Sequence, residues 1–460
     1  MSCRIAGFSA IFCGFVLAGS ACTGGAGSDG ASGSGGDVSS PSTGGAGGGG
    51  QQSRGGQQSR GGQQSGGGQQ SRGGQQSGGA PGGTASVGGA RGAGDNAGGA
   101  EADGAAWATG GAAGATDGGL RDYLGDPRFP DSFWEPATFA ESNIDPAPLE
   151  QAVSLIADSG WEIHSFLVAR NGKLVFERYG WKSGTNDADP DKVPHQVLPD
   201  ERHQQFSTTK SFLSALVGVA LAEGSLSGLN VHAADSFPDY SQLSPSPEKS
   251  SITLQDLLTM RSGLEFVEGD QTTFDTPDPA RAMFSRPVVD TPVGTVWNYS
   301  SGGANVIAEM LRVATGKTPL EYGNEKLFGP IGIDSPPWDA GRNGTSFGGF
   351  GLSLTAREMA RFGELFRNAG AWQGQPVVPS AWTDESTTPR CPTAWGGQYG
   401  YLWWVPSLPG FFNALGSFGQ MIYVSRERGL VVVFTAYMQN DVAKNNVERL
   451  IRDYVLPSAH

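Results

Sequence analysis

The fold is decided by the stretch FSTTKSFLSALVGVALAEGSL, residues 206–226. Its apolar run predicts a helix from Ser207 to Ala222, and Gly224 is expected to end it. Residues three apart share one face of a helix, so the Lys210 amine can reach the Ser207 hydroxyl. A serine hydroxyl becomes an effective nucleophile when a nearby base takes its proton. The stretch therefore predicts a nucleophile and its base at the start of an apolar helix.

Lys210 can act as this base only when its amine is neutral. The ordinary lysine pKa of about 10.4 would have to fall by roughly 3 units, which corresponds to about 4 kcal/mol. The apolar run that follows can supply the necessary burial, because desolvation disfavours an ammonium group. Taken alone, the pair fits a helix-capping serine beside a solvated lysine equally well, so the remaining sequence has to decide.

A second S-x-x-K pattern, Ser246 to Lys249, shows how weak this spacing is by itself. It overlaps the proline-containing stretch 244–247, which favours a loop, and no apolar run follows it. We expect no chemistry from this second copy.

The first 21 residues are typical of an export signal. Arg4 supplies positive charge, residues 5–17 form a short apolar core, and small residues precede Cys22. This core is too short for a stable membrane span. Small residues before a cysteine resemble a bacterial lipoprotein processing site, although Gly19 stands where such sites usually carry leucine. We expect an exported cell-envelope protein, lipidated at Cys22 and anchored to a membrane there, with simple secretion as the alternative.

Residues 22–118 are of low complexity. They hold most of the 73 glycines of the chain and a tandem Gln-Gln-Ser-Arg-Gly-Gly repeat that begins at Gln51. Large apolar side chains are almost lacking, so burial cannot offset the entropy of the chain. We expect a disordered tether with a reach of about 50–60 Å, by random-coil scaling.

Residues 119–460 are rich in aromatic and aliphatic side chains and are long enough for one large domain with two lobes. The only cysteine after Cys22 is Cys391, which excludes a disulfide within this domain, and the five scattered histidines predict no metal site. The formal net charge of −14 argues against nucleic acid or an anionic membrane surface as a partner. No cofactor is predicted.

Strand signals lie at both ends of this domain. Residues 165–170 and 173–179 flank Asn171-Gly172, a strong hairpin signal, and residues 420–424 and 430–435 form a second β-prone pair.

Helix signals fill the middle of the domain. Helices are predicted at 253–258 with Thr253 as the cap, at 305–313, and at 355–368 with a capping box. A last helix is expected at 441–455. Its apolar face comprises Val442, Val447, Leu450, Ile451 and Val455. The pattern predicts an α+β fold, with an antiparallel sheet built from both termini, flanking helices and an inserted, mainly helical lobe. Ligand sites commonly form between such lobes.

Five sequence blocks, in this order, resemble the serine β-lactamase-like hydrolases. They are the stretch 206–226, ITLQDLLTMRSGL (252–264), WNYSSGGANVIAEML (297–311), FGGFGLSLTAREMARFG (347–363) and ALGSFGQMIYV (414–424). This superfamily includes penicillin-binding proteins, class C β-lactamases, related esterases and 6-aminohexanoate-oligomer hydrolases. The resemblance covers nearly all of residues 160–440 and implies the β-lactamase/transpeptidase-like fold, in agreement with the layout above.

The resemblance also implies roles for the residues that match the family motifs. Ser207 becomes the acyl-accepting nucleophile and Lys210 its proton partner. Tyr299 matches the catalytic tyrosine of the family. A tyrosine near an ammonium is easier to deprotonate, so it can pass a proton to the leaving group. Ser301 stands where many members carry asparagine, as in some amide hydrolases of the group, and is expected to bind substrate.

The third family motif matches residues 414–417 and departs from the family at its first position. Ala414 replaces the lysine that, when present, holds a substrate carboxylate. Recognition of a penicillin or a peptidoglycan stem peptide is therefore expected to be weak. Gly416 lets a substrate approach the strand closely. The backbone N–H groups of Ser207 and Ser417 are expected to form the oxyanion hole.

Other patterns carry less weight. Residues 344–348 fit G-x-S-x-G, but a nucleophile elbow needs a strand directly before it and a helix directly after it, so a structural turn is expected. His203 suggests a Ser-His-Asp triad, although Lys210 already fills the role of the base. The aromatic residues between 395 and 404 are expected mainly to pack the core, with one or two at the substrate cleft.

Together these features predict an exported serine hydrolase that cleaves an ester or small amide substrate through a Ser207 acyl-enzyme. One alternative is a β-lactamase or D-Ala-D-Ala carboxypeptidase. The other is a catalytically silent cell-surface binding protein with the same fold.

Overall fold

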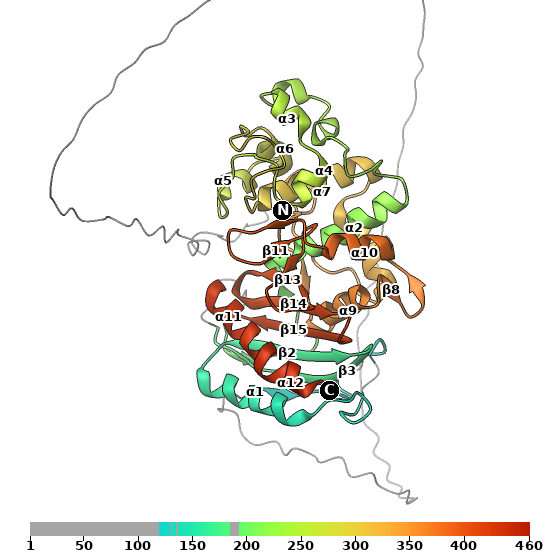
Figure 1. Cartoon of the computed structure of the whole chain (residues 1–460), viewed down its shortest axis with the longest axis vertical. Coiled ribbons are helices and arrows are strands. Elements are labelled where there is room, and N and C mark those ends of the chain that lie inside the picture. Colours follow the sequence, from blue (N-terminus) through green and yellow to red (C-terminus); the bar gives the residue numbers. More distant parts are fainter. Residues whose placement is uncertain (1–118, 130, 135–136, 185–192) are drawn as a thin grey trace, which may run out of the picture. The chain divides into compact units, whose positions relative to one another are not determined.

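The computed structural model describes residues 119–129, 131–134, 137–184 and 193–460 (Figure 1). The expected export signal, the expected lipidation residue Cys22 and the expected tether lie outside the described residues. Among the described helices, none combines the length and hydropathy that a membrane span requires.

A nine-stranded antiparallel sheet runs through the domain in the order β1-β3-β2-β15-β14-β13-β12-β11-β10 (Figure 1). Its strands are β1 (Arg121–Asp122), β2 (Ile163–Arg170), β3 (Lys173–Tyr179), β10 (Cys391–Pro392), β11 (Gln398–Tyr399), β12 (Trp404–Val405), β13 (Phe412–Gly416), β14 (Gln420–Ser425) and β15 (Leu430–Ala436). The two ends of the domain meet where β2 pairs with β15. This confirms the predicted antiparallel sheet built from both termini.

The predicted hairpin between β2 and β3 is present. Asn171 and Gly172 both have positive φ angles, 51° and 85°, as a two-residue turn of this kind requires. The Asn171 amide donates a hydrogen bond of 2.8 Å to the carbonyl oxygen of Gly429, in the turn between β14 and β15. The two hairpins are therefore joined at their turns as well as through the β2–β15 pairing.

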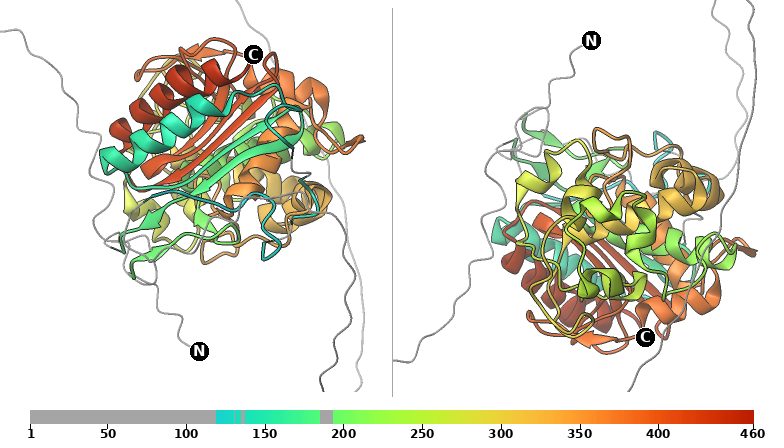
Figure 2. Two further views of the ribbon diagram at one scale, coloured as in Figure 1. Left: turned by 90° about the horizontal axis from the view of Figure 1, so that it is seen from below. Right: turned by 90° about the horizontal axis from the view of Figure 1, so that it is seen from above.

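Helices cover both faces of the sheet. On one face, α1 (Pro146–Ser159) and α11 (Asn440–Leu450) lie side by side (Figure 2), and the chain continues as a π-helical turn to Val455. Their buried side chains join those of β2, β14 and β15 in one apolar cluster. On the other face, α9 (Ala356–Arg367) packs against β14 and β15. Helix α9 begins with the predicted capping box, formed by Thr355 and Glu358.

One residue of the last helix was placed on the wrong face. Val447, Leu450, Ile451 and Val455 are buried as predicted, but Val442 is 41% exposed. The neighbouring Ala443 takes the buried place in the first turn. Successive helical residues point about 100° apart, so both cannot face the sheet.

The predicted helical lobe lies between the two groups of strands in the sequence. Its helices are α2 (Thr209–Ala222), α3 (Pro247–Ser251), α4 (Leu254–Leu258), α5 (Gln271–Phe274), α6 (Pro279–Phe284), α7 (Ser301–Thr315) and α8 (Pro319–Gly323), with α10 (Ser380–Thr387) after α9. Helix α2 is buried around its whole circumference up to Ala220. It is therefore a core helix, as its continuous apolar run predicted.

The remaining elements are short. They are the strand pairs β4 (Trp181–Lys182) with β5 (His195–Gln196), β6 (His203–Gln204) with β7 (Ser353–Leu354), and β8 (Ala371–Trp372) with β9 (Gln375–Pro376), and the terminal turn α12 (Leu456–Ser458).

Two boundaries near the S-x-x-K patterns differ from the prediction. Ser207 lies in a 3₁₀ turn, Phe206–Thr208, and the α-helix starts at Thr209. Ser246 caps a short helix instead of lying in a loop, because its hydroxyl accepts the backbone N–H of Lys249 at 3.1 Å. The Lys249 amine is buried and donates to the carbonyl oxygen of Leu243. In this second copy the lysine amine thus has a partner other than the serine.

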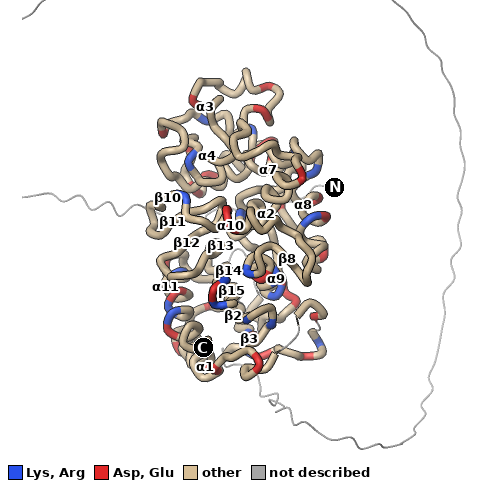
Figure 3. The backbone as a smooth tube through the Cα atoms, turned by 45° about the vertical axis from the view of Figure 1, so that its right-hand side comes forward, with Lys and Arg blue, Asp and Glu red and all other residues tan. Residues whose placement is uncertain are grey.

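Acidic and basic residues are interspersed over the described part of the chain (Figure 3). Some of them form buried ion pairs between elements. Arg357 of α9 forms a two-pronged pair with Glu177 of β3, at 2.7 and 2.8 Å, and the Glu177 side chain is fully buried. This pair ties helix α9 to the strand next to β2.

Candidate active site

Ser207 lies in the 3₁₀ turn Phe206–Thr208, here called the nucleophile turn. Its flanks are tied to two other elements: the Gln205 amide donates to the carbonyl oxygen of Leu352 at 2.7 Å, and the Thr208 hydroxyl donates to that of Gln420 at 2.9 Å. Phe206 has a positive φ of 46°, which is uncommon for a bulky residue. The turn is thus held in a conformation that leaves the Ser207 side chain half-buried.

The Lys210 amine lies 2.9 Å from the Ser207 hydroxyl oxygen. It also contacts the Ser301 hydroxyl at 2.8 Å and the carbonyl oxygen of Gly349 at 2.9 Å. The lysine is buried in the first turn of α2. Burial lowers the pKa of Lys210 to about 8, while the charge of Glu268 acts in the opposite direction. A substantial fraction of the amine is therefore neutral near pH 8.

Tyr299 completes a triangle with these two residues. It lies two residues before α7, hydrogen-bonds to Ser207 through its side chain and is 7% exposed. The Lys210 amine lies 4.7 Å from the centre of its ring. Burial raises the pKa of the Tyr299 phenol well above its ordinary value, the charge of Glu268 raises it further, and the hydrogen bond with Ser207 opposes both effects.

The expectation that Tyr299 is easily deprotonated is therefore wrong. Desolvation of the phenolate outweighs any help from Lys210, whose amine is itself partly neutral. Burial thus favours the neutral phenol form of Tyr299 over the phenolate.

Ser301, the first residue of α7, lies between Lys210 and a carboxylate. Its hydroxyl oxygen is 2.8 Å from the Lys210 amine and 2.5 Å from Glu268 Oε1. Its backbone N–H donates to Glu268 Oε2 at 3.0 Å. The hydroxyl that was expected to bind substrate is thus part of the network around Lys210.

Glu268 is the site residue that the sequence reasoning missed. It lies in the loop between α4 and α5, four residues after the end of the second family block. An acidic residue in a polar loop carries no periodic or motif signal. Only the folded chain brings it to the start of α7.

Two glycines let the loop before β7 reach Lys210. A Cβ atom on Gly348 would lie 2.1 Å from the carbonyl oxygen of Ala304, and one on Gly349 would lie 2.8 Å from the Cβ of Ser301. The Gly348 amide donates to Asn305 Oδ1 at 2.8 Å, which fixes the loop on α7. Because no side chain intervenes, the Gly349 carbonyl can approach the lysine amine.

The third motif lies beside the nucleophile turn. A Cβ atom on Gly416 would meet the carbonyl oxygen of Gln205 at 2.2 Å, so the end of β13 packs directly on this turn. Ser417 follows immediately and is half-buried. Strand β12 pairs with β13 at Asn413, the residue just before the motif. Ala414 is fully buried, two residues before Gly416 on the same face of the strand.

Aromatic rings surround Tyr299. Trp395 and Trp404 have ring centres 5.3 and 5.5 Å from its ring, and Trp297 lies at 6.1 Å. Trp395 is 40% exposed, whereas Tyr399 is fully buried. Most of the aromatic cluster therefore packs the core, as expected, and Trp395 is the member that reaches solvent near Tyr299.

The two weaker patterns are structural. Ser346 is buried and its hydroxyl accepts the Leu320 amide at 3.2 Å, beside a turn at Gly344. His203 is buried in β6 and stacks on His164, with ring centres 5.4 Å apart. The G-x-S-x-G stretch therefore forms the expected turn, and the contact that the structure gives for the His203 ring is with His164.

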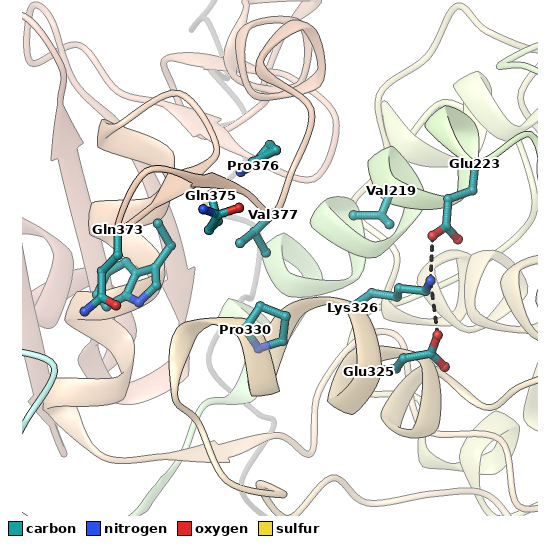
Figure 4. A pocket seen from close by; sticks show the side chains of 10 residues that line it. Val219, Glu223, Glu325, Lys326, Pro330, Gln373, Gln375, Pro376 and Val377 are labelled. Carbon is teal, nitrogen blue, oxygen red and sulfur yellow. Dashed lines mark ion pairs between the residues drawn. The ribbon is translucent and has the colours of Figure 1, made fainter.

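A surface hollow lies elsewhere, between the end of α2 and the β8–β9 hairpin (Figure 4). Lys326 lines it and pairs with Glu223 at 2.6 Å and with Glu325 at 3.1 Å. Ser207, Lys210 and Tyr299 are not among its lining residues. The candidate active site is therefore identified from the contacts among Ser207, Lys210 and Tyr299, and this hollow is a separate feature.

An antiparallel sheet with an inserted helical lobe, and an S-x-x-K turn against one of its strands, define the β-lactamase-fold hydrolases. The Beta-lactamase family model matches residues 164–455, so the chain belongs to this family.

Three known proteins show what this chain resembles in sequence or in fold. The 6-aminohexanoate-dimer hydrolase of Paenarthrobacter ureafaciens is 24% identical over 301 residues, which are 58% of this chain and 71% of the relative. A penicillin-binding protein homologue from Caulobacter crescentus shares the fold with a TM-score of 0.56 and 19% identity, covering 70% of this chain and 97% of its own. A family VIII carboxylesterase has a TM-score of 0.55 and 19% identity, covering 67% and 96%.

Proposed function

We propose that this protein is a serine hydrolase that cleaves ester or small amide bonds through a covalent Ser207 acyl-enzyme. The observation that carries the proposal is the contact of 2.9 Å between the Ser207 hydroxyl and a buried lysine amine. Burial lowers the pKa of that amine to about 8, so it can accept a proton under mildly basic conditions.

Acylation begins when Ser207 Oγ attacks the substrate carbonyl carbon and its proton passes to the neutral Lys210 amine. The carbonyl electrons move onto the carbonyl oxygen, which the backbone N–H groups of Ser207 and Ser417 stabilise. Losing one such donor typically lowers the rate about 10²–10³-fold. When the tetrahedral intermediate collapses, the bond to the leaving group breaks and the acyl group stays on Ser207.

The leaving alcohol or amine needs a proton. In the proposal, Lys210 returns the proton it took, and the Tyr299 hydroxyl passes it on, since Tyr299 hydrogen-bonds to Ser207. The phenol gives up its own proton only as it receives another, in keeping with its raised pKa. Such acid–base assistance is worth roughly 10²–10⁴-fold. Water, activated by the same groups, then releases the acid and restores Ser207.

The substrate is proposed to be an uncharged ester or small amide. Ala414 supplies no positive charge where a lysine would hold a substrate carboxylate, which disfavours penicillins and stem peptides. The names of a carboxylesterase and a 6-aminohexanoate-dimer hydrolase among the relatives support the ester and amide classes. We further propose that the protein is exported and anchored at Cys22, on the strength of residues 1–22.

The test is covalent labelling with a fluorophosphonate probe, which reacts with activated serines. We expect labelling of the wild type and its loss in Ser207→Ala. Ser246→Ala is the matched control, because it removes the serine of the other S-x-x-K copy and should leave labelling unchanged. Equal labelling of wild type and Ser207→Ala would refute the assignment. Stable acylation by a fluorescent penicillin at low concentration would instead favour the β-lactamase or carboxypeptidase alternative.

A further inference from the structure

We propose that Glu268 positions the general base: its carboxylate orients the Ser301 hydroxyl, and Ser301 in turn orients the Lys210 amine toward Ser207. The inference rests on the proposed function of Ser207 and Lys210. It adds a fifth side chain, after Ser207, Lys210, Tyr299 and Ser301, from a loop outside the motifs that define the family resemblance.

The first step concerns the two hydrogen bonds between Glu268 and Ser301. One carboxylate oxygen contacts the Ser301 hydroxyl at 2.5 Å, and the other accepts the Ser301 backbone N–H at 3.0 Å. Ser301 opens helix α7, where unpaired N–H groups favour a negative charge. Two contacts to one residue fix both the carboxylate and the serine side chain.

The second step is the direction of each hydrogen bond. An ionised carboxylate can only accept, so Ser301 must donate its single hydroxyl hydrogen to Glu268. The Ser301 oxygen then faces Lys210 as an acceptor, at 2.8 Å. The Gly349 carbonyl oxygen, at 2.9 Å, is a second obligatory acceptor.

The third step follows from counting hydrogens on the neutral amine. Its two N–H groups are taken by Ser301 and Gly349, so its lone pair points at the third neighbour, the Ser207 hydroxyl at 2.9 Å. This is the direction from which a base must take the Ser207 proton. Without Glu268 the Ser301 hydroxyl could turn its hydrogen toward Lys210 and compete for the lone pair.

The charge of Glu268 has a second effect. Among the described residues, the titratable side chains that face Lys210 are Glu268, from the α4–α5 loop, and Tyr299, from the segment before α7. Glu268 favours the ammonium form and partly offsets the effect of burial on the pKa of Lys210. Glutamine loses the charge and keeps one oxygen that can accept the Ser301 hydroxyl, whereas the Ser301 backbone N–H loses its acceptor. The variant therefore separates the charge of Glu268 from its effect on the orientation of the Ser301 hydroxyl.

The experiment measures the rate of fluorophosphonate labelling against pH in the full-length protein. In Glu268→Gln we expect a maximal rate within about threefold of wild type, with the rise of the profile displaced to lower pH. In Glu268→Ala and Ser301→Ala we expect the maximal rate to fall about 10²-fold, the size of effect that a misplaced catalytic group can produce. Glu265→Gln, an exposed carboxylate three residues earlier, is the control and should match wild type.

Thermal melting of each variant shows whether it is folded. Unchanged maximal rates and pH profiles in folded Glu268→Gln, Glu268→Ala and Ser301→Ala would overturn the positioning role. If labelling of the wild type depends on Ser207 and these variants show the same labelling rates and pH profiles as the wild type, only this inference is overturned. Labelling that survives Ser207→Ala would instead overturn the proposed function.

Discussion

At the scale of single residues, the chemistry depends on how Lys210 is buried. The lysine amine is enclosed by three hydrogen-bonding oxygens, yet burial still lowers its pKa to about 8. The three polar neighbours therefore compensate only in part for the hydration that the charged amine loses on burial. The nearby carboxylate of Glu268 limits the fall, so the site holds a lysine that changes charge in a useful pH range.

The protonation state of Lys210 determines whether activity should rise or fall with pH. Below about pH 8 the amine is protonated and cannot act as a base, and above it the neutral form predominates. We expect kcat/KM for a short-chain aryl ester to rise with pH and to level off above about pH 8. Lys210→Met should lower kcat by about 10²–10⁴-fold. A flat profile between pH 6 and 9 for the wild type would contradict a titrating lysine base.

The same scale shows what could be predicted from the sequence. The closeness of Ser207 and Lys210 follows from their spacing at a helix start, and Tyr299 was identified from the family motif. Glu268 could not be predicted, because it lies 58 positions after Lys210 in the sequence and no motif contains it. The raised pKa of Tyr299 was missed because it depends on burial and on Glu268, which only the folded structure supplies.

At the scale of elements, β13 packs against the nucleophile turn, so the segments that carry the two proposed oxyanion donors, Ser207 and Ser417, are held next to each other. Gly416 is the point of closest approach, since a Cβ atom there would lie 2.2 Å from the Gln205 carbonyl oxygen. Backbone cannot yield as a flexible side chain can, so a larger residue must push the strand and the turn apart.

Gly416→Ala should therefore lower kcat about 10²–10³-fold, the effect of losing one oxyanion donor. Leu415→Ala is the control: Leu415 points to the opposite face of β13, where it packs on the apolar cluster formed by α1, α11, β2, β14 and β15. It should lower the melting temperature with little change in kcat. Equal kcat in wild type and Gly416→Ala would argue against this strand as part of the oxyanion hole.

The ion pair between α9 and β3 is a second link between elements. Removing one partner leaves a buried charge without compensation, which typically costs 3–5 kcal/mol. We expect Arg357→Met to lower the free energy of unfolding by about this amount. The double variant Arg357→Met/Glu177→Met should recover most of the loss. Urea unfolding of the wild type, the single variants and the double variant measures this coupling, and additive losses would contradict it.

At the scale of the whole molecule, the general layout could be predicted and the details could not. The hairpin turn at Asn171-Gly172 and the apolar run of β15 are local signals, and they fixed the sheet built from both ends. Strands β10, β11 and β12 have two residues each, too few for any alternation to be read. Their place in the sheet depends on pairing with β13, which is a tertiary contact.

The proposed lipid anchor is a prediction about the whole chain. In a bacterial host that processes lipoproteins, we expect the protein to incorporate an alkyne-labelled fatty acid and to partition into the detergent phase of Triton X-114. Cys22→Ala should abolish both. Full incorporation in this variant would exclude Cys22 as the modified residue, and a water-soluble wild type without the label would favour simple secretion.

The position of the Trp395 indole makes its fluorescence a possible signal of substrate binding. It is partly open to solvent and lies 5.3 Å from the ring of Tyr299 and 5.7 Å from Trp404. Filling the space beside the phenol would change the polarity around this indole, and with it the emission wavelength and intensity. Each turnover would then leave a transient in stopped-flow fluorescence, so formation and decay of the covalent intermediate could be timed without a chromogenic substrate.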